Sequence, residues 1–230
     1  MLSKAPSYLV HTFTALGVVF GFLALVATVD GKIPEAFLWL AAALFVDGVD
    51  GTLARAVNVN QNTPEIDGAI LDNIIDYLNY VVVPVFIFYS LGMAPEQYLL
   101  LSCIAILLVS CFTFINTNIK TDDFYFSGFP AIWNIVVLYF YILESSEFTN
   151  FIFVILFCVL TFIPFKYVHP FRVVEFRKIT LMITSIWMIT TTILLFDLSF
   201  SNPIFTSTNF IIWLITNVYF AGTIVFRSIK

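Results

Sequence analysis

Long apolar stretches, separated by short polar connections, recur along almost the whole chain. Eight can be placed, and their length favours helices over strands. Apolar runs of about 20 residues are typical of helices that cross a lipid bilayer, and the fifth run is shorter than that. The pattern predicts an all-α, polytopic membrane bundle of about eight transmembrane helices, at about 8–29, 35–55, 68–91, 98–116, 129–143, 148–165, 179–198 and 209–226.

Composition agrees with a membrane protein and excludes an ordinary soluble domain. Of the 230 residues, 60% are hydrophobic and only 11% are charged. The longest polar connection covers about residues 58–67, and no internal repeat is visible. We therefore expect one integral-membrane domain over residues 1–230.

The basic residues predict how the chain is oriented. An even number of spans places both termini on one side of the membrane, and Lys and Arg favour the cytoplasmic side. Of the ten Lys and Arg residues, only Lys32 falls on the side away from the termini. Both termini are therefore expected in the cytoplasm. The net charge of −5 comes largely from acids within spans and in an outer loop, and it gives no reason to expect a nucleic-acid partner.

Four aspartates interrupt the second and third predicted spans. Asp47 and Asp50 lie three residues apart and Asp72 and Asp76 lie four apart, so each pair shares one helical face. An Asp at the centre of a membrane helix costs about 2.5 to 3.5 kcal/mol, so such residues mark functional sites. A purely structural ion-pair cluster would need several cations, and Arg55 is the only one nearby in the sequence.

The two acidic pairs are predicted to lie at the same depths in the membrane. Counted from the polar connection, one acid of each pair lies about one turn into its helix and the other about two turns. Antiparallel neighbours would bring the four carboxylates together. Such oxygen donors suit Mg²⁺ or Mn²⁺, and two ions can clamp the attacking and leaving oxygens of a displacement at phosphorus. The donors suit one or two such ions, and the sequence predicts phosphoryl-group transfer at a membrane surface, with two divalent ions expected in each site.

The spacing of these residues resembles the signature of the CDP-alcohol phosphotransferase family. The matching positions are Asp47, Asp50, Gly51, Ala54, Arg55, Gly68, Asp72 and Asp76. Twelve residues separate the arginine from the second glycine, more than in most of the family, and this longer connection is similar to that of bacterial phosphatidylcholine synthases. The runs DYLNYVVVP, GFPAIWN and KYVHPF also resemble that subgroup. The resemblance implies a six-helix family core with two additional C-terminal spans, and a homodimer.

The resemblance also implies a role for each position of the motif. The metal ions would be bound by Asp47, Asp50, Asp72 and Asp76. The nucleotide would be bound by Gly51, Ala54, Arg55 and Gly68, although an arginine at a span end is also a common interfacial anchor. Asp76 is the expected general base. The implied reaction is attack of an alcohol oxygen on the lipid-side phosphorus of CDP-diacylglycerol, which releases CMP.

If the alcohol is choline, aromatic faces must recognise its quaternary ammonium, because that group has no hydrogen to donate. The candidates are Tyr77, Tyr80, Tyr125 and Trp133. With 18% aromatic residues in the chain, each of them is also explained by packing alone. Candidates for contact with lipid phosphate are Lys120, Lys166 and Arg172, which also obey the orientation rule. His11 and His169 have no second histidine at ligand spacing, and neither is assigned to metal.

Two alternatives stay open at the level of sequence. Serine, inositol, glycerol phosphate or ethanolamine as acceptor would keep the chemistry and change the alcohol pocket. Intramembrane carboxylates also form the sites of cation transporters, but those sites usually interrupt helices near the midplane, whereas these acids lie towards one side. The leading prediction is a phosphatidyltransferase acting on choline in a bacterial cytoplasmic membrane, with its active site facing the cytoplasm.

Overall fold

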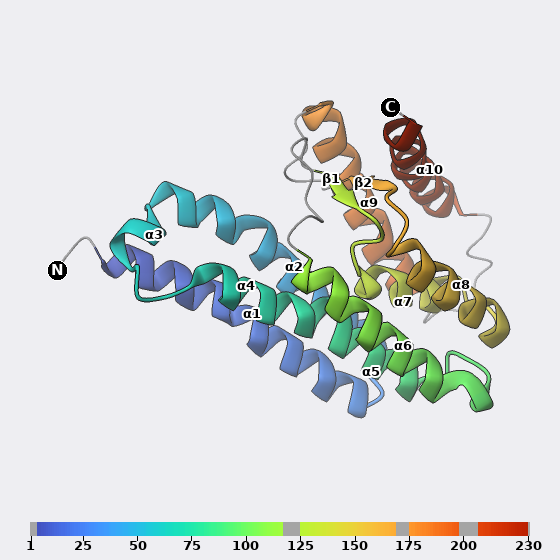
Figure 1. Ribbon diagram of the computed structural model, residues 1–230. Coiled ribbons are helices and arrows are strands. Elements are labelled where there is room, and N and C mark those ends of the chain that lie inside the picture. The colour runs from blue at the N-terminus through green and yellow to red at the C-terminus, as the bar shows by residue number, and fades with distance from the viewer. Residues whose placement is uncertain (1–3, 117–124, 169–174, 198–206, 230) are drawn as a thin grey trace.

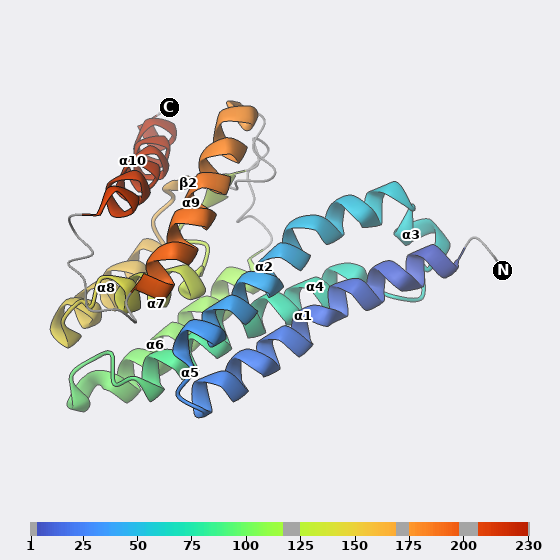
Figure 2. The ribbon, with the colours of Figure 1, turned by 180° about the vertical axis from the view of Figure 1, so that it is seen from behind.

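The computed structural model describes residues 4–116, 125–168, 175–197 and 207–229. Within these ranges the chain is a bundle of helices with one small sheet, so the all-helical prediction is confirmed (Figure 1, and Figure 2 from behind). The long helices are α1 (Ala5–Val29), α2 (Ile33–Ala56), α6 (Glu96–Ile115), α9 (Arg177–Asp197) and α10 (Thr208–Ile229). The shorter helical elements are α3 (Val59–Asn62), α4 (Gly68–Tyr77), the π-helical turn η1 (Leu78–Val82), α5 (Val83–Ser90), α7 (Trp133–Ile142) and α8 (Glu147–Leu160).

Among the residues that the structure describes, six helical segments are long and apolar enough to cross a membrane, with α4, η1 and α5 counted as one segment. This makes the chain a multi-pass membrane protein. Helices α7 and α8 have only 10 and 14 residues, or roughly 15 and 21 Å, which is less than a hydrocarbon core of about 30 Å. All eight predicted apolar segments contain helix, but a count of eight spanning helices is not confirmed.

Prolines explain why α7 and α8 are shorter than the apolar runs that contain them. Pro130 and Ala131 precede α7, and Ala131 has a φ of 55°, outside the right-handed helical region. Pro164 follows α8 and cannot donate a backbone hydrogen bond. The apolar run therefore begins before the start of α7, and the next apolar run continues past the end of α8.

The short sheet was not anticipated by the hydrophobic pattern. Strand β1 (Tyr125–Ser127) pairs antiparallel with β2 (Lys166–Val168), and Phe126 lies opposite Tyr167. The sheet joins the connection that precedes α7 to the one that follows α8. The backbone N–H of Lys166 donates to the hydroxyl of Ser228 at 2.8 Å. The sheet therefore lies beside the C-terminal end of α10.

Two glycines allow α1 to lie against the third spanning segment. Helix α1 packs along α2 and also contacts α4, η1 and α5. A Cβ atom on Gly17 would lie 2.6 Å from Cγ2 of Ile75, and one on Gly21 would overlap the side-chain amide of Asn79. Small residues four positions apart are typical of close helix packing in membranes. This close approach places α1 at the wall of the acidic site described below.

A proline also shapes the third spanning segment. In η1 the N–H of Val83 donates to the carbonyl of Leu78, five residues earlier. Pro84 follows directly and has no N–H for the carbonyl of Tyr80. The wide turn is the local result, and it changes which side chains of the segment face α1 and α2.

Candidate active site

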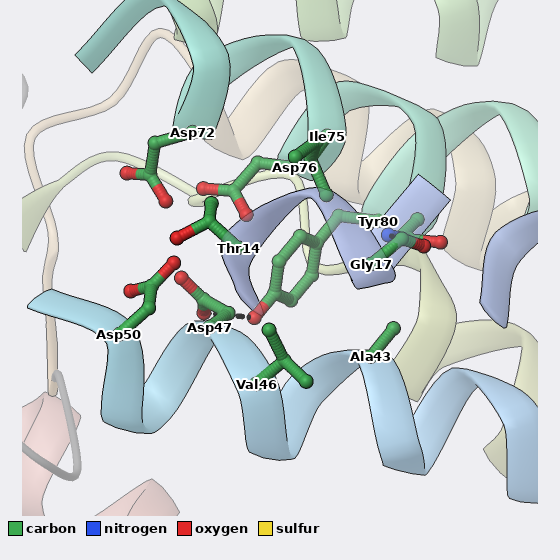
Figure 3. A pocket seen from close by; sticks show the side chains of 11 residues that line it. Thr14, Gly17, Ala43, Val46, Asp47, Asp50, Asp72, Ile75, Asp76 and Tyr80 are labelled. Atoms are coloured by element: carbon green, nitrogen blue, oxygen red, sulfur yellow. Dashed lines mark hydrogen bonds between the residues drawn. The ribbon is translucent and has the colours of Figure 1, made fainter. Parts of the chain in front are cut away.

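The four motif aspartates line one small cavity between α1, α2 and α4 (Figure 3). One carboxylate oxygen from each of Asp47, Asp50 and Asp72 lies within 4.8 Å of the other two. We call these three residues the acidic cluster. Asp50 is buried, with 6% of its surface exposed, and the other two are half-buried. The structure thus brings the two helical pairs together, as their matched depths predicted.

Asp76 lies beside the acidic cluster and lines the same cavity. In Figure 3 its carboxylate lies next to that of Asp72, one turn further along α4, and both face α2. The start of α4 is fixed by Asp67, whose side chain accepts hydrogen bonds from the N–H groups of Ala69 at 3.0 Å and Ile70 at 3.1 Å. This cap sets the register in which the two acids of α4 face α2.

The donor set of the acidic cluster fits a hard divalent cation. All of its ligand atoms are carboxylate oxygens, without histidine or cysteine, which is the preference of Mg²⁺ and Mn²⁺. Three carboxylates at this separation repel one another, and burial of Asp50 strengthens that repulsion by removing water. A bound cation would relieve it.

The expected nucleotide residues flank the acidic site towards the α2–α4 connection. Gly51 and Ala54 are half-buried on α2, and Gly68 is the first residue of α4. A Cβ on Gly68 would lie 3.4 Å from Cε1 of His11. Arg55 is exposed, and its guanidinium donates to the hydroxyl of Thr52 at 3.1 Å.

Helix α1 is tied to the α2–α4 connection by side chains. The ring Nε2 of His11 and the hydroxyl of Thr63 are hydrogen-bonded at 3.0 Å, and both side chains are buried. Glu65 accepts from the hydroxyl of Tyr8 at 2.8 Å and from Nζ of Lys4 at 3.2 Å. Hydrogen bonds from its own backbone, from the tyrosine and from the lysine lower the pKa of Glu65. His11 therefore has a hydrogen-bond partner that connects α1 to the α2–α4 connection.

The four aromatic candidates do not form one cage. Tyr80 alone among them lines the acidic cavity. The hydroxyl of Tyr77 donates to the carbonyl of Leu107 on α6. The indole of Trp133 is buried and donates to Ser110. Tyr125 is buried in β1, where the guanidinium of Arg227 lies 5.4 Å from its ring centre.

Of the basic candidates for lipid phosphate, only Lys166 can be located. It is half-buried in β2, next to the end of α10. Lys120 and Arg172 lie outside the described residues, as does His169.

Comparison with known proteins identifies the family. The model of the CDP-alcohol phosphatidyltransferase family matches residues 7–163, which include all four aspartates. The chain belongs to this family. A phosphatidylcholine synthase from Pseudomonas aeruginosa is 40% identical over 229 residues, covering 100% of this chain and 94% of the relative. One from Borreliella burgdorferi is 41% identical over 180 residues, with 78% and 77% covered, and one from Legionella pneumophila is 44% identical over 167 residues, with 72% and 66% covered.

The family match of this phosphatidyltransferase ends before α9 and α10. These two helices pack on each other, and α9 also contacts α2. They stand at the opposite end of the molecule from the N-terminus (Figure 1). The alignment with the Pseudomonas relative continues through them, so the C-terminal pair is a feature shared with that protein.

Two polar residues that line the acidic cavity of the phosphatidyltransferase, Thr14 and Asn79, were given no role from the sequence, although Asn79 shares the helical stripe of Asp72 and Asp76. Thr14 of α1 lies beside the carboxylates in Figure 3, and Asn79 of η1 lines the same cavity. The amide of Asn79 donates to the carbonyl of Gly17 at 3.0 Å. Gly17 and Gly21 indicate that α1 packs closely on the third span, and Pro84 indicates an irregular turn there. These three residues lie outside the acidic motif.

Proposed function

We propose that the protein transfers the phosphatidyl group of CDP-diacylglycerol to choline, giving phosphatidylcholine and CMP. The observation that carries the proposal is the acidic cluster, at which Asp47, Asp50 and Asp72 converge in a chain of the CDP-alcohol phosphatidyltransferase family. The choice of choline is supported by relatives from several bacteria that are named phosphatidylcholine synthase.

The four aspartates have two different roles in the proposed mechanism. Asp47, Asp50 and Asp72 would hold Mn²⁺ or Mg²⁺, two ions in each site, whose charge would offset that of the pyrophosphate. Asp76 accepts the proton of the choline hydroxyl as its oxygen attacks the phosphorus that carries the diacylglycerol. The bond from this phosphorus to the bridging oxygen breaks, and CMP leaves with that oxygen. Asp76 then returns its proton to solvent.

The nucleotide is proposed to bind along Gly51, Ala54 and Gly68, where the absence of large side chains lets a ligand approach the backbone. Arg55 is exposed at the end of α2 and is free to turn from Thr52 towards a phosphate. Lys166, with Lys120 and Arg172, is proposed to contact lipid phosphate on the same side.

For choline, Tyr80 is the favoured aromatic face because it lies in the acidic cavity. A trimethylammonium group there would also be attracted by the neighbouring carboxylates. Tyr77, Tyr125 and Trp133 stay candidates of lower rank, because their polar atoms or faces are engaged elsewhere.

We further propose eight membrane-embedded helices, with both termini and the active site on the cytoplasmic side of a bacterial inner membrane. Lys4 pairs with Glu65, and the β2 residue Lys166 contacts Ser228, so the two termini lie beside connections assigned to one side. Residues 1–230 would form one domain, a six-helix core extended by α9 and α10, and two copies would associate as a homodimer.

The test is turnover by purified protein in lipid nanodiscs. CMP release from CDP-diacylglycerol with Mn²⁺ is compared for choline, serine, inositol, glycerol phosphate and ethanolamine. Choline-dependent release is expected, and Asp76→Asn should abolish it while nucleotide-lipid binding persists. Turnover with another alcohol and not with choline would show that this other alcohol is the acceptor. Failure with all of them, together with Mn²⁺ flux into sealed vesicles, would favour a cation transporter.

A further inference from the structure

The third spanning segment consists of α4, η1 and α5, and its π-helical turn η1 contacts both α1 and α2 beside the acidic site. The turn also contacts α6 and α7. Two neighbouring side chains of the turn make its polar contacts to α1 and α2. Asn79 donates to the carbonyl of Gly17 on α1 at 3.0 Å, and Tyr80 donates to Oδ2 of Asp47 on α2 at 2.6 Å. Wide turns of this kind often occur at functional sites.

The contact between Tyr80 and Asp47 is short and charge-assisted. A hydroxyl that donates to a carboxylate makes a stronger hydrogen bond than one between neutral groups, especially away from water. The hydroxyl engages one oxygen of Asp47, and one oxygen of this carboxylate belongs to the acidic cluster. In Figure 3 the ring lies between Val46 and Asp76, so the tyrosine approaches the carboxylate along the cavity wall. The hydrogen bond therefore limits the rotation of Asp47.

We propose that Tyr80 is a positioning residue that orients Asp47 for a divalent cation, and that the π-helical turn η1 directs the hydroxyl of Tyr80 towards Asp47. This inference rests on the proposed function of the acidic cluster. It assigns the hydroxyl a task separate from the aromatic face, which remains available to an organic cation. Groups that orient metal ligands contribute about 10- to 100-fold to metal affinity or activity.

The experiment compares Tyr80→Phe with the unaltered full chain in nanodiscs. Mn²⁺ binding is measured directly, by the electron paramagnetic resonance signal of free Mn²⁺, without substrate. We expect the dissociation constant for Mn²⁺ to rise about tenfold or more, while the KM for choline at saturating Mn²⁺ stays within about twofold, because the ring is retained. Tyr77→Phe is the matched control, because that hydroxyl donates to Leu107 on α6 and should leave Mn²⁺ affinity unchanged.

Equal Mn²⁺ affinity of Tyr80→Phe and the unaltered chain would overturn the inference and leave the proposed function standing. So would an equal loss of affinity in the Tyr77→Phe control, since that would show a general effect of hydroxyl removal on packing. If the unaltered chain binds no Mn²⁺, the metal site of the proposed function fails and this inference fails with it. Thermal unfolding of both variants shows whether each remains folded.

Discussion

Replacing Gly17 by alanine tests whether close packing of α1 holds the acidic site together. The added Cβ would lie 2.6 Å from Cγ2 of Ile75. An ordinary contact between carbon atoms is about 3.5 to 4.0 Å, so either the Ile75 side chain shifts or α1 and α4 separate, and the β-branched Ile75 is stiff at χ1. We expect the two helices to move apart by up to about 1 Å at this level. Overpacking of this kind costs about 1 to 3 kcal/mol. We therefore expect a lower unfolding temperature for Gly17→Ala.

The same displacement should affect catalysis more than stability. Ile75 lies in α4 between Asp72 and Asp76, and it lines the acidic cavity with them. Misplacing reacting groups by about 1 Å can lower a rate about 10²-fold. The assay is CMP release from CDP-diacylglycerol with choline and saturating Mn²⁺, alongside thermal unfolding in the same nanodiscs.

Gly222→Ala is the matched control for this substitution. Gly222 lies within α10, and a Cβ there would meet nothing within 4 Å. Alanine favours a helix by about 1 kcal/mol over glycine, so this variant should be at least as stable as the unaltered chain and equally active. Turnover by Gly17→Ala within about twofold of the unaltered chain, with an unchanged unfolding temperature, would refute the assigned packing role.

Three further predictions concern single side chains. Asp72→Asn should raise the Mn²⁺ dissociation constant at least about tenfold, and calorimetric titration showing equal affinity would contradict its place in the acidic cluster. His11→Ala should lower the free energy of unfolding by about 0.5 to 1.5 kcal/mol, because the buried Thr63 hydroxyl loses one of its two hydrogen bonds and keeps the one to the carbonyl of Val59; an unchanged denaturation midpoint would count against this. The pKa of Glu65 is lowered from 4.5, so its contribution is present above pH 4.5 and is lost as pH falls through the folded-state pKa. The gap in unfolding temperature between Glu65→Gln and the unaltered chain should therefore close in acid, and a constant gap would refute the stabilising role given to the ionised, hydrogen-bonded carboxylate.

The acidic site was predictable because the positions of the aspartates in the sequence determine which helical face they share and how deep in the bundle they lie. Separations of three and four residues fix a helical face, and the count from the connection fixes the level within the bundle. Neither quantity depends on how the remaining helices pack. The structure accordingly places one carboxylate oxygen from each of Asp47, Asp50 and Asp72 within 4.8 Å of the other two.

Packing details were not predictable from the hydrophobic pattern. The pattern counts apolar residues and misses Pro130, which precedes the start of α7, and Pro164, which follows the end of α8. The three-residue strands are too short to show alternation. The aromatic candidates were chosen by residue type, but Trp133 and Tyr77 are directed by partners on α6 that lie far away in the sequence. Tyr80 reaches the cavity through the π-helical turn, which reflects Pro84 and lies outside the acidic motif.

The short length of α8 has a consequence for the surrounding bilayer. Its 14 residues expose a row of large apolar side chains, among them Phe148, Ile152 and Leu156. If α8 crosses the bilayer as proposed, its helical part gives lipids an apolar wall of roughly 21 Å, about 9 Å less than an average hydrocarbon core, and exposed Phe162 and Phe165 past its end supply part of the difference. The mismatch that remains can be relieved by thinning of the membrane, at a fraction of a kcal/mol per Å. We expect the protein to carry a dimple in the bilayer along α8, so that lipid headgroups sit deeper there than elsewhere around its perimeter.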